Sequence, residues 1–408
     1  MAPAYIVTRG GHTAIVLERA QSFPPTGGSI HISPNACRAL SSLELMSALE
    51  DHVVVEQHIT LMSYATGAVL KRMDLVPSMQ DDYGFPYLSL GRVSLHDCLL
   101  RAAQEAGAII KYGCVVRSVD FNAPAVHVAD GRVITADLIV GADGENSRCR
   151  SLLLGRPDPP LHFGHKVFSC PVSLAALRSQ SDSARFAEDP GMLWWMGPGT
   201  MVLGSTQGKH QGMDLMGGLI EPQDTPLQAR PLPVSKKEIK EAFQGWDPVI
   251  EKLLDKAGDC VKWTSTATAV LEQWAHPAGR FVLLGDAAHA MTPYLAQGAS
   301  SALEDAVALG VLLSQVTELG QVPEAVRIFQ NLREPRCRRL KEVSQSLRDV
   351  YCMNNGPRQE SRDHELMNVI PGPGFVIPWL DPDFQAWVYG YDVVEEARRA
   401  WPEREQGT

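Results

Sequence analysis

This 408-residue sequence lacks several features, and each absence excludes a class of protein. No two of its eight cysteines stand three residues apart, so there is no CxxC pair to hold a metal or form a redox disulfide. No run of about 18 apolar residues occurs, which excludes a predicted membrane-spanning helix. The first residues, Met1 to Val7, are too few and too soon followed by polar residues to form a signal peptide.

Charge and composition are those of a globular protein without a basic face. Lys and Arg total 37 and Asp and Glu total 47, so the formal net charge is −10, which argues against a nucleic-acid binder. Apolar residues make up 45% of the chain, enough to bury a sizeable core in about two or three domains. Because scattered thiols favour a reducing compartment, we expect a cytoplasmic protein. We also expect it to be a monomer or a homodimer.

Strand and helix patterns alternate along the chain around a β-rich stretch between about 160 and 225. Buried or alternating runs predict strands at 14–17, 53–64, 68–75, 109–110, 115–119, 126–128, 138–140 and 281–284. Capping residues and spaced apolar residues predict helices from Ser33, from Arg92 to Gly107, near 235–257, at 297–313 and at 323–351. This order predicts an α/β nucleotide-binding fold with a second sheet domain and a helical end.

The most specific motif is the run from Gly279 to Ala299, which reads GRFVLLGDAAHAMTPYLAQGA. A buried strand would deliver Asp286 to the carboxyl end of the sheet, where ligands bind in such folds. An Asp there accepts hydrogen bonds from a sugar hydroxyl. Gly298 and Ala299 begin a helix whose free N–H groups suit a phosphate or an electron-rich ring edge. A strand-turn-helix with a capping Asp is the plainer interpretation, but it does not explain a run of this length.

The segment GDAAHAMTPYLAQGASSALEDA resembles the second flavin motif of single-component FAD-dependent aromatic hydroxylases, the salicylate and para-hydroxybenzoate hydroxylase type. The resemblance implies that Asp286 binds the ribityl chain of FAD. It also implies that Pro293, Gly298 and Ala299 border the isoalloxazine ring. The family often has Asn where this chain has Ser301, which is a mild departure.

Further residues extend the likeness over nearly the full chain. LIVGADGENS is similar to the family's DG motif, which implies that Asp143 and Gly144 support the FAD pyrophosphate side and a transient NAD(P)H site. Glu18 matches the ribose-binding acid at a strand end, and Arg92 matches the arginine that reaches the phosphate and ribose of FAD. Taken alone, Glu18 is typical of a surface residue and Arg92 of a solvated helix cap. The likeness continues in LREPR at 332–336 and WVYGYD at 387–392.

The resemblance implies an α/β fold with three regions. A Rossmann-like FAD-binding domain would be discontinuous over 1–60, 85–158 and 260–315. A β-rich substrate domain would cover 61–84 and 159–259. Residues 316–408 would form a helical C-terminal region.

The glycine-rich fingerprint of a dinucleotide fold precedes the ribose acid by roughly 20 residues. Counting back from Glu18 places it at or before Met1, and Tyr5 to Arg9 are typical of the end of the helix that follows it. We therefore expect the first strand and the glycine loop to be missing, sheet edges to be exposed, and FAD to bind weakly. Two explanations stay open: an incomplete chain, which we favour, or a flavin-free relative that serves as a binding protein.

The mechanism implied by the family needs no protein nucleophile. Oxygen transfer would pass through a flavin C4a-hydroperoxide, so the catalytic residues are unknown and no metal is required. Relatives place Arg and Tyr on the β-rich domain to activate a phenol, but the corresponding strands here read KVFSC at 166–170 and VLGS at 202–205. His165 and His210 are possible substitutes, although a surface position is the more common one for either.

The sequence therefore predicts an FAD-dependent monooxygenase that uses NAD(P)H and O2 to hydroxylate a phenolic or polyketide-like aromatic, in secondary metabolism or aromatic catabolism. Trp194 and Trp195 would line the pocket or, more commonly for strand aromatics, lie in the core. A flavin-dependent epoxidase of an olefin and an inactive relative are the alternatives. A plain nicotinamide dehydrogenase is disfavoured because it would not need the Asp286 motif.

Overall fold

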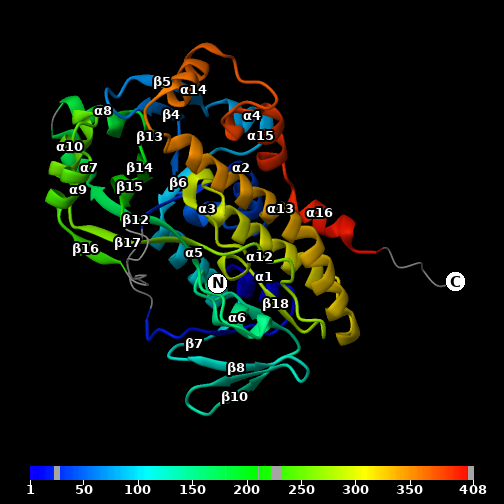
Figure 1. Cartoon of the computed structure of the whole chain (residues 1–408). Helices are drawn as coiled ribbons and strands as arrows, with labels where there is room; N and C mark the ends of the chain where they lie inside the picture. The colour runs from blue at the N-terminus through cyan, green and yellow to red at the C-terminus, as the bar shows by residue number, and fades with distance from the viewer. Residues whose placement is uncertain (23–27, 180, 210, 222–230, 403–408) are drawn as a thin grey trace.

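The computed structural model describes residues 1–22, 28–179, 181–209, 211–221 and 231–402. It consists of a mixed α/β half, an eight-stranded sheet with helices on its outer face, and a set of C-terminal helices (Figure 1). The predicted fold class is confirmed. The predicted domain boundaries stay a prediction.

Two parallel strand pairs form the centre of the α/β half. β1 (Ile15–Leu17) pairs with β7 (Ile109–Lys111), and β11 (Ile139–Gly141) pairs with β18 (Phe281–Leu283). Within the described ranges no backbone ladder joins the two pairs. The apolar residues of β18 are all buried, as expected for the interior of a parallel sheet.

Three helices pack around these strands in one hydrophobic core: α1 (Ala2–Arg9), α5 (Arg92–Glu105) and α12 (Gly298–Ser314). Helix α1 approaches α12 so closely that a Cβ on Gly310 would lie 1.9 Å from Ile6 Cγ2, so only glycine fits there. The other helices of this half are α2 (Pro34–Ser42), α3 (Met46–Leu49), α4 (Ser78–Tyr83), α6 (Arg148–Leu154) and α11 (Asp286–His289).

Two small antiparallel sheets complete the α/β half. In the first, β6 (Leu88–Gly91) lies between β2 (Ser29–Ile32) and β3 (Val54–Val55). In the second, β9 (Ala125–Val128) lies between β8 (Val116–Asp120) and β10 (Val133–Thr135). The first sheet packs beside the large sheet and thereby joins the two halves of the molecule.

The large sheet has the strand order β16-β17-β12-β15-β14-β13-β4-β5 and is antiparallel except between β4 and β13. Its strands are β4 (His58–Ser63), β5 (Val69–Asp74), β12 (Leu161–Val172), β13 (Gly191–Gly197), β14 (Thr200–Gly208), β15 (Gly212–Ile220), β16 (Leu232–Val234) and β17 (Cys260–Ala267). The outer face is covered by α7 (Leu174–Arg178), α8 (Ser181–Glu188), α9 (Lys236–Ala242) and α10 (Pro248–Lys256).

The opposite face of the large sheet contributes to a second cluster, here called the inner core. Its buried members include Tyr87, Trp194, Leu203, Leu295, Tyr351 and Tyr389. Strand β13 is buried throughout, and its side chains alternate between the two faces: Trp194 lies in the inner core and Trp195 under the outer helices.

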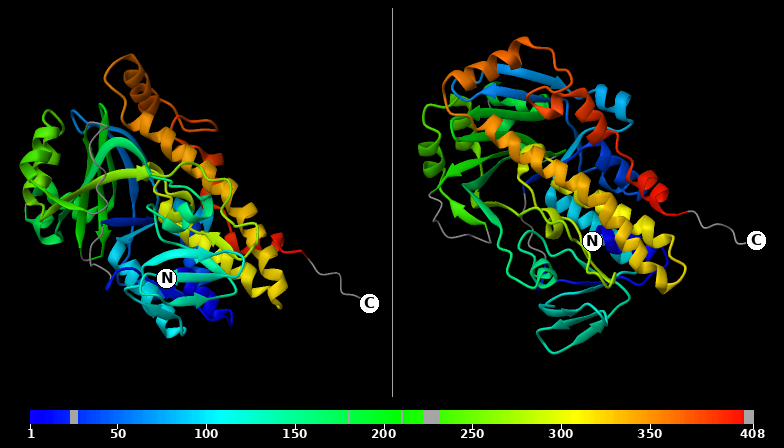
Figure 2. Two further views of the ribbon diagram at one scale, coloured as in Figure 1. Left: turned by 60° about the horizontal axis from the view of Figure 1, so that its bottom comes forward. Right: turned by 45° about the vertical axis from the view of Figure 1, so that its right-hand side comes forward.

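The C-terminal region is helical, as predicted. Helix α13 (Val322–Tyr351) runs from the α/β half along the molecule toward α14 (Pro357–Asn368), as both views in Figure 2 show. Helices α15 (Pro382–Tyr389) and α16 (Val393–Ala400) follow, and short 3-10 turns occur at η1 (Pro293–Leu295), η2 (Leu319–Gln321) and η3 (Pro378–Leu380). Every helix among the described residues is too short or too polar to cross a membrane.

The predicted single strand at 53–64 is wrong. The Glu56 N–H donates to the Tyr87 carbonyl at 2.9 Å and so ends the ladder of β3 on β6. The Gln57 N–H donates to the Pro190 carbonyl at 2.8 Å and so starts the pairing with the large sheet. The chain changes sheets between these two residues. In the sequence the change falls at the three consecutive polar residues Glu56, Gln57 and His58. Glu56 is nevertheless fully buried.

Candidate functional site

The turn after β18 presents one exposed acid in an otherwise buried stretch. Gly285 has φ +59° and ψ −141°, a conformation that glycine adopts readily and other residues rarely. Asp286 follows as the first residue of α11 and is exposed, whereas the residues on both sides are buried. The Gly285 N–H donates to Asp305 Oδ2 at 3.0 Å, so α12 fixes the turn from below. The motif thus holds the Asp286 carboxylate at the surface end of the strand.

The loop between Asp286 and α12 leaves a helix start open. Pro293 is exposed at the start of η1, and Ala296 reverses the chain at φ +53°. No side chain caps the first turn of α12, because the Gln297 amide instead donates to Ser33 Oγ at 2.9 Å. A Cβ on Gly298 would have Met291 Cγ as its nearest neighbour, at 4.0 Å. The first N–H groups of α12 are therefore available to a ligand.

The Asp143-Gly144 turn is built around helix α6. The Asp143 carboxylate accepts a hydrogen bond from the Ser147 hydroxyl and bonds from the N–H groups of Arg148 at 2.8 Å and Cys149 at 3.0 Å. Gly144 has φ +80°. Asp143 therefore holds the start of α6, and its predicted contact with the cofactor stays a prediction.

Arg150 on α6 joins the two motifs, and sequence reasoning missed it. Its side chain is fully buried and donates to the Ala287 carbonyl at 3.1 Å and to the Glu145 carbonyl at 2.9 Å. Its Nε also pairs with Asp158 Oδ2 at 2.7 Å. The sequence holds one sign of its burial: Arg150 stands three and four residues before Leu153 and Leu154, which places a charged side chain on the apolar face of the helix.

Replacing Arg150 by Lys should lower the free energy of unfolding by about 1–3 kcal/mol, because the charge opposite Asp158 is kept but at least one backbone carbonyl loses its donor. Urea denaturation measures the change. Arg156→Lys is the matched control, since Arg156 lies 4.0 Å from the same Asp158 but is 68% exposed. Equal stabilities of the two variants would contradict the bridging role.

The structure brings Arg92 to the two motifs, and Glu18 stands at the end of β1. Arg92 is exposed at the start of α5, after the Gly91 turn. Burial raises the pKa of Glu145; neighbouring Asp286 raises it further and Arg92 opposes the rise, so the three charges lie near one another. Glu18 ends β1, and its carboxylate accepts a hydrogen bond from the Ala20 N–H at 2.8 Å. The predicted cofactor role of Glu18 stays a prediction.

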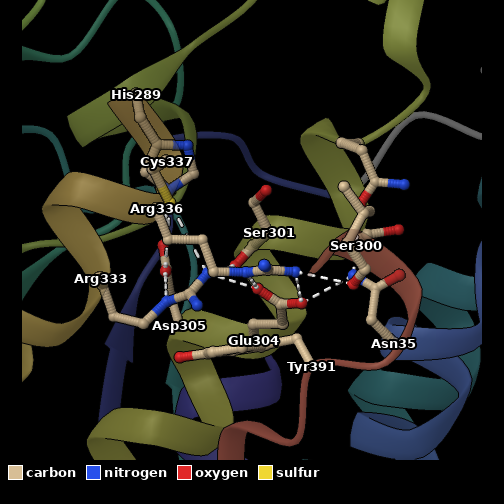
Figure 3. A network of polar contacts seen from close by, with 12 residues as sticks. Asn35, His289, Ser300, Ser301, Glu304, Asp305, Arg333, Arg336, Cys337 and Tyr391 are labelled. Carbon is tan, nitrogen blue, oxygen red and sulfur yellow. Dashed lines mark hydrogen bonds and ion pairs between the residues drawn. The ribbon is translucent and has the colours of Figure 1, made fainter. Parts of the chain in front are cut away.

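Beneath the Asp286 turn lies a buried network of charges, shown in Figure 3. Glu304 and Asp305 of α12 face Arg333 and Arg336 of α13. Arg333 lies 2.7 Å from Glu304 and 2.8 Å from Asp305, and Arg336 lies 2.9 Å from Glu304. Burial alone would raise the pKa of Asp305, but His289 and Arg333 bring it down to about 2. The network fixes α12 and, through Asp305, the turn that presents Asp286.

One corner of this network has the ligand types of a metal site. His289, Asp305 and Cys337 lie within 4.8 Å of one another and are buried. However, the Arg333 guanidinium bonds Asp305 at 2.8 Å, and His289 Nε2 bonds its other oxygen at 2.6 Å. A metal ion would have to break the His289–Asp305 hydrogen bond and displace Arg333 from Asp305, so the arrangement is that of an ion-pair network.

Comparison with known proteins identifies the family. Residues 1–342 match the family described as FAD binding domain. FAD-dependent monooxygenase OpS4 of Beauveria bassiana is 30% identical over 405 residues, which cover 97% of this chain and 94% of the relative. The chain belongs to the FAD-dependent aromatic monooxygenases.

Other relatives agree with this assignment. 6-Hydroxynicotinate 3-monooxygenase of Pseudomonas fluorescens is 32% identical over 322 residues, which cover 77% of this chain and 80% of the relative. A salicylate hydroxylase substrate complex shares the fold, with a TM-score of 0.78 at 21% identity over 99% of this chain and 96% of that one. The protein is an enzyme of this class, and FAD is its cofactor.

The residues of this aromatic monooxygenase fit FAD. Exposed Asp286 offers a carboxylate to ribityl hydroxyls, the open start of α12 offers N–H groups to the ring edge, and Arg92 offers a cation to phosphate. The open space at Gly298 would admit a flat ring edge beside the backbone.

The two tryptophans predicted to line the pocket and the two histidines predicted as substitute proton acceptors lie in different environments. The ring of Trp194 lies 5.0 Å from that of Tyr351, centroid to centroid, at a tilt of 42° in the inner core. The Trp195 indole N–H donates to Asp247 at 2.8 Å under the outer helices. The surface interpretation of His165 is wrong: it is buried, and its two nitrogens each lie 2.8 Å from a carbonyl, of Phe163 and Gly199. His210 lies outside the described residues.

Proposed function

We propose that this monooxygenase uses NAD(P)H and O2 to hydroxylate a phenolic or polyketide-like aromatic, in secondary metabolism or aromatic catabolism. One observation carries the proposal: the loop that begins at Pro293, the predicted flavin border, continues into Tyr294 and Leu295, which pack in the inner core with Trp194. The relatives' names support it, since 6-hydroxynicotinate and 3-amino-4-hydroxybenzoate are both rings that carry a hydroxyl group.

The roles divide between cofactor and chain. FAD, when bound, supplies the activation of O2 and the transfer of one oxygen atom. The chain would hold FAD through Asp286, Arg92 and the start of α12, orient the aromatic ring, and exclude water with the apolar side chains of the inner core. We propose that NAD(P)H binds transiently beside the Asp143-Gly144 turn.

An olefin epoxidase is the second candidate, and one observation favours it. Where relatives carry residues that activate a phenol, this chain has Lys166, whose Nζ is bound to Glu221 at 2.8 Å, and apolar Leu203. An olefin needs no deprotonation, so such a site would suit it. Analysis of the product distinguishes a new ring hydroxyl from an epoxide.

We also propose a cytoplasmic location and a monomeric or homodimeric state. All eight cysteines are free and seven of them are buried, which supports a reducing compartment. Size-exclusion chromatography of the purified protein would report the oligomeric state.

The activity is tested by adding FAD and either nicotinamide cofactor to the purified protein and offering a panel of phenols and olefins. Because the sequence predicts weak FAD binding, FAD is supplied in excess. We then expect a yellow protein that absorbs at about 450 nm and oxidises NAD(P)H faster when a phenol is present. With heavy-isotope O2 the product should carry one labelled oxygen. A protein that binds no flavin, or a product whose new oxygen comes from water, would contradict the proposal.

A further inference from the structure

Three buried polar side chains with few hydrogen-bond partners converge on the small sheet of β2, β3 and β6. His31 Nε2, both Glu56 carboxylate oxygens and Ser89 Oγ are shielded from water. The Ser89 hydroxyl is the hydrogen-bonding group beside the Glu56 carboxylate and lowers its pKa, whereas His31 Nε2 has no partner within hydrogen-bonding distance among the described residues. His31 pairs in register with Ser89, and Glu56 follows β3 beside them. His31 Nε2 lies 3.9 Å from Glu56 Oε1. Unpaired buried polar groups cost roughly 1–3 kcal/mol each, so a fold that keeps several together calls for a functional explanation.

The alternation of β2 directs His31 away from the core of the α/β half. Ile30 and Ile32 pack into that core, so Ser29, His31 and Ser33 share the opposite side. Ser29 Oγ reaches Ser205 on β14 of the large sheet at 2.7 Å. Ser33 Oγ reaches Ser300 in the first turn of α12 at 3.1 Å. His31 therefore lies between the large sheet and the predicted flavin border.

His31 and Glu56, here called the pair, also lie beside the aromatic side chains of the inner core. The ring of Tyr87 lies 6.4 Å from that of His31 and 6.1 Å from that of Tyr389. Among the described residues, Tyr87 is the titratable group that interacts with Glu56, and Cys37, Tyr351 and Tyr389 in turn interact with Tyr87. Burial raises the pKa of all four, which keeps them neutral. Of these neighbouring groups, only His31 and Glu56 can therefore gain or lose a proton near neutral pH.

Burial sets the charge state of the resting pair. It lowers the pKa of His31 to about 4 and raises the pKa of Glu56 to about 8. At neutral pH the resting pair is uncharged, with one proton on the carboxyl group. A carboxyl that ionises near pH 8 can both hold and release a proton under working conditions.

We propose that His31 and Glu56 act as a proton-sharing pair that accepts the hydroxyl proton of the aromatic substrate, with Glu56 as the positioning residue. The proposal rests on the proposed function and supplies the acceptor that Lys166 and Leu203 do not. Its reactive form has an ionised Glu56 and a proton on His31 Nε2. The substrate hydroxyl gives its proton to His31 Nδ1, so its O–H bond breaks and an N–H bond forms. At the same time His31 Nε2 gives its own proton to the Glu56 carboxylate, so the Nε2–H bond breaks and the carboxyl O–H bond forms. One negative charge passes from Glu56 to the ring oxygen, and no electrons are exchanged. The 3.9 Å separation would shorten when substrate closes the site.

The ionisation of bound 4-nitrophenol tests the pair without any oxygenation step, because its phenolate form is yellow. The FAD-loaded protein should lower the apparent pKa of the bound probe by at least about one unit, or about tenfold in ionisation. Glu56→Gln and His31→Asn should each abolish that shift. Glu50→Gln, the same change at an exposed position on the preceding helix turn, is the matched control and should retain it.

A wild-type protein that leaves the ionisation of 4-nitrophenol unchanged, whether by not binding it or by binding it passively, overturns the proposal. So does a Glu56→Gln protein that shifts it as the wild type does. Neither result depends on turnover, so the proposed function can fail separately if no phenol is hydroxylated. Where a phenol is hydroxylated, the pH profile of kcat should lose its rise near pH 8 in Glu56→Gln.

Stability against pH provides a second readout that needs no ligand. The native carboxyl of Glu56 stays protonated up to about pH 8, whereas the unfolded one ionises near 4.5. Wild-type stability should therefore fall as pH rises through this window, and Glu56→Gln should flatten the fall. If Glu56→Gln does not fold, Glu56→Asp replaces it in the 4-nitrophenol experiment, since it keeps the carboxyl but withdraws it from His31. An unchanged slope contradicts a protonated Glu56.

Discussion

Arg333→Met should lower the free energy of unfolding by about 3–5 kcal/mol, enough to unfold a protein of ordinary stability in part. The substitution removes a fully buried cation that lies 2.7 Å from Glu304 and 2.8 Å from Asp305. Two buried carboxylates would then share only Arg336 and His289. The cost comes from leaving charge unpaired in a dry interior, which exceeds the worth of the pair itself. Urea denaturation measures the loss.

Two further variants separate this network from ordinary surface pairing. Arg327→Met, on the same helix, removes an arginine that is 60% exposed and pairs with Glu324, so it should change stability by less than about 1 kcal/mol. Adding Asp305→Asn to Arg333→Met should recover part of the loss, because one of the stranded charges disappears. An Arg333→Met protein as stable as Arg327→Met would contradict the structural role of the network.

Asp286→Ala should weaken FAD binding by about 10–100-fold while leaving the fold intact. A hydrogen bond to a charged acceptor contributes roughly 1.5–3 kcal/mol, and each 1.4 kcal/mol or so is about tenfold in affinity. The fold should tolerate the change because Asp286 is exposed and its neighbours carry the packing. Titration of FAD, followed by quenching of its fluorescence, gives the dissociation constant.

The controls for Asp286 lie on the same chain. Asp286→Asn keeps an acceptor but not the charge and should fall between wild type and alanine. Asp51→Ala removes an aspartate whose side chain is 93% exposed, far along the sequence from the motif, and should bind FAD as the wild type does. Equal FAD affinities of Asp286→Ala and Asp51→Ala would remove Asp286 from the cofactor site.

Local sequence predicted the elements that present the flavin residues. The apolar β18, the Gly285 turn and the start of α12 are each specified by neighbouring residues, so the predictions at 281–284 and 297–313 agree with the structure to within one residue at either end. The amino-acid pattern alone therefore places Asp286 correctly at a strand end and Gly298 at a helix start.

Contacts between distant residues could not be predicted in the same way. Arg150 bonds the Ala287 carbonyl across 137 positions, and Arg333 pairs with residues of another helix. His165 of β12 is buried, and its ring contacts the Gly199 carbonyl in the turn between β13 and β14, a relation set by sheet pairing. The change of sheets at Glu56 is set by hydrogen bonds to the distant Tyr87 and Pro190 carbonyls, which local sequence does not reveal.

A crystal structure of the protein with FAD is the most direct test of the central claim, that the Asp286 turn and the start of α12 form the cofactor site. We expect the ribityl chain within hydrogen-bonding distance of the Asp286 carboxylate and the isoalloxazine edge against the N–H groups of Gly298 and Ala299. FAD bound elsewhere on the molecule, or crystals that stay colourless in excess FAD, would contradict the account.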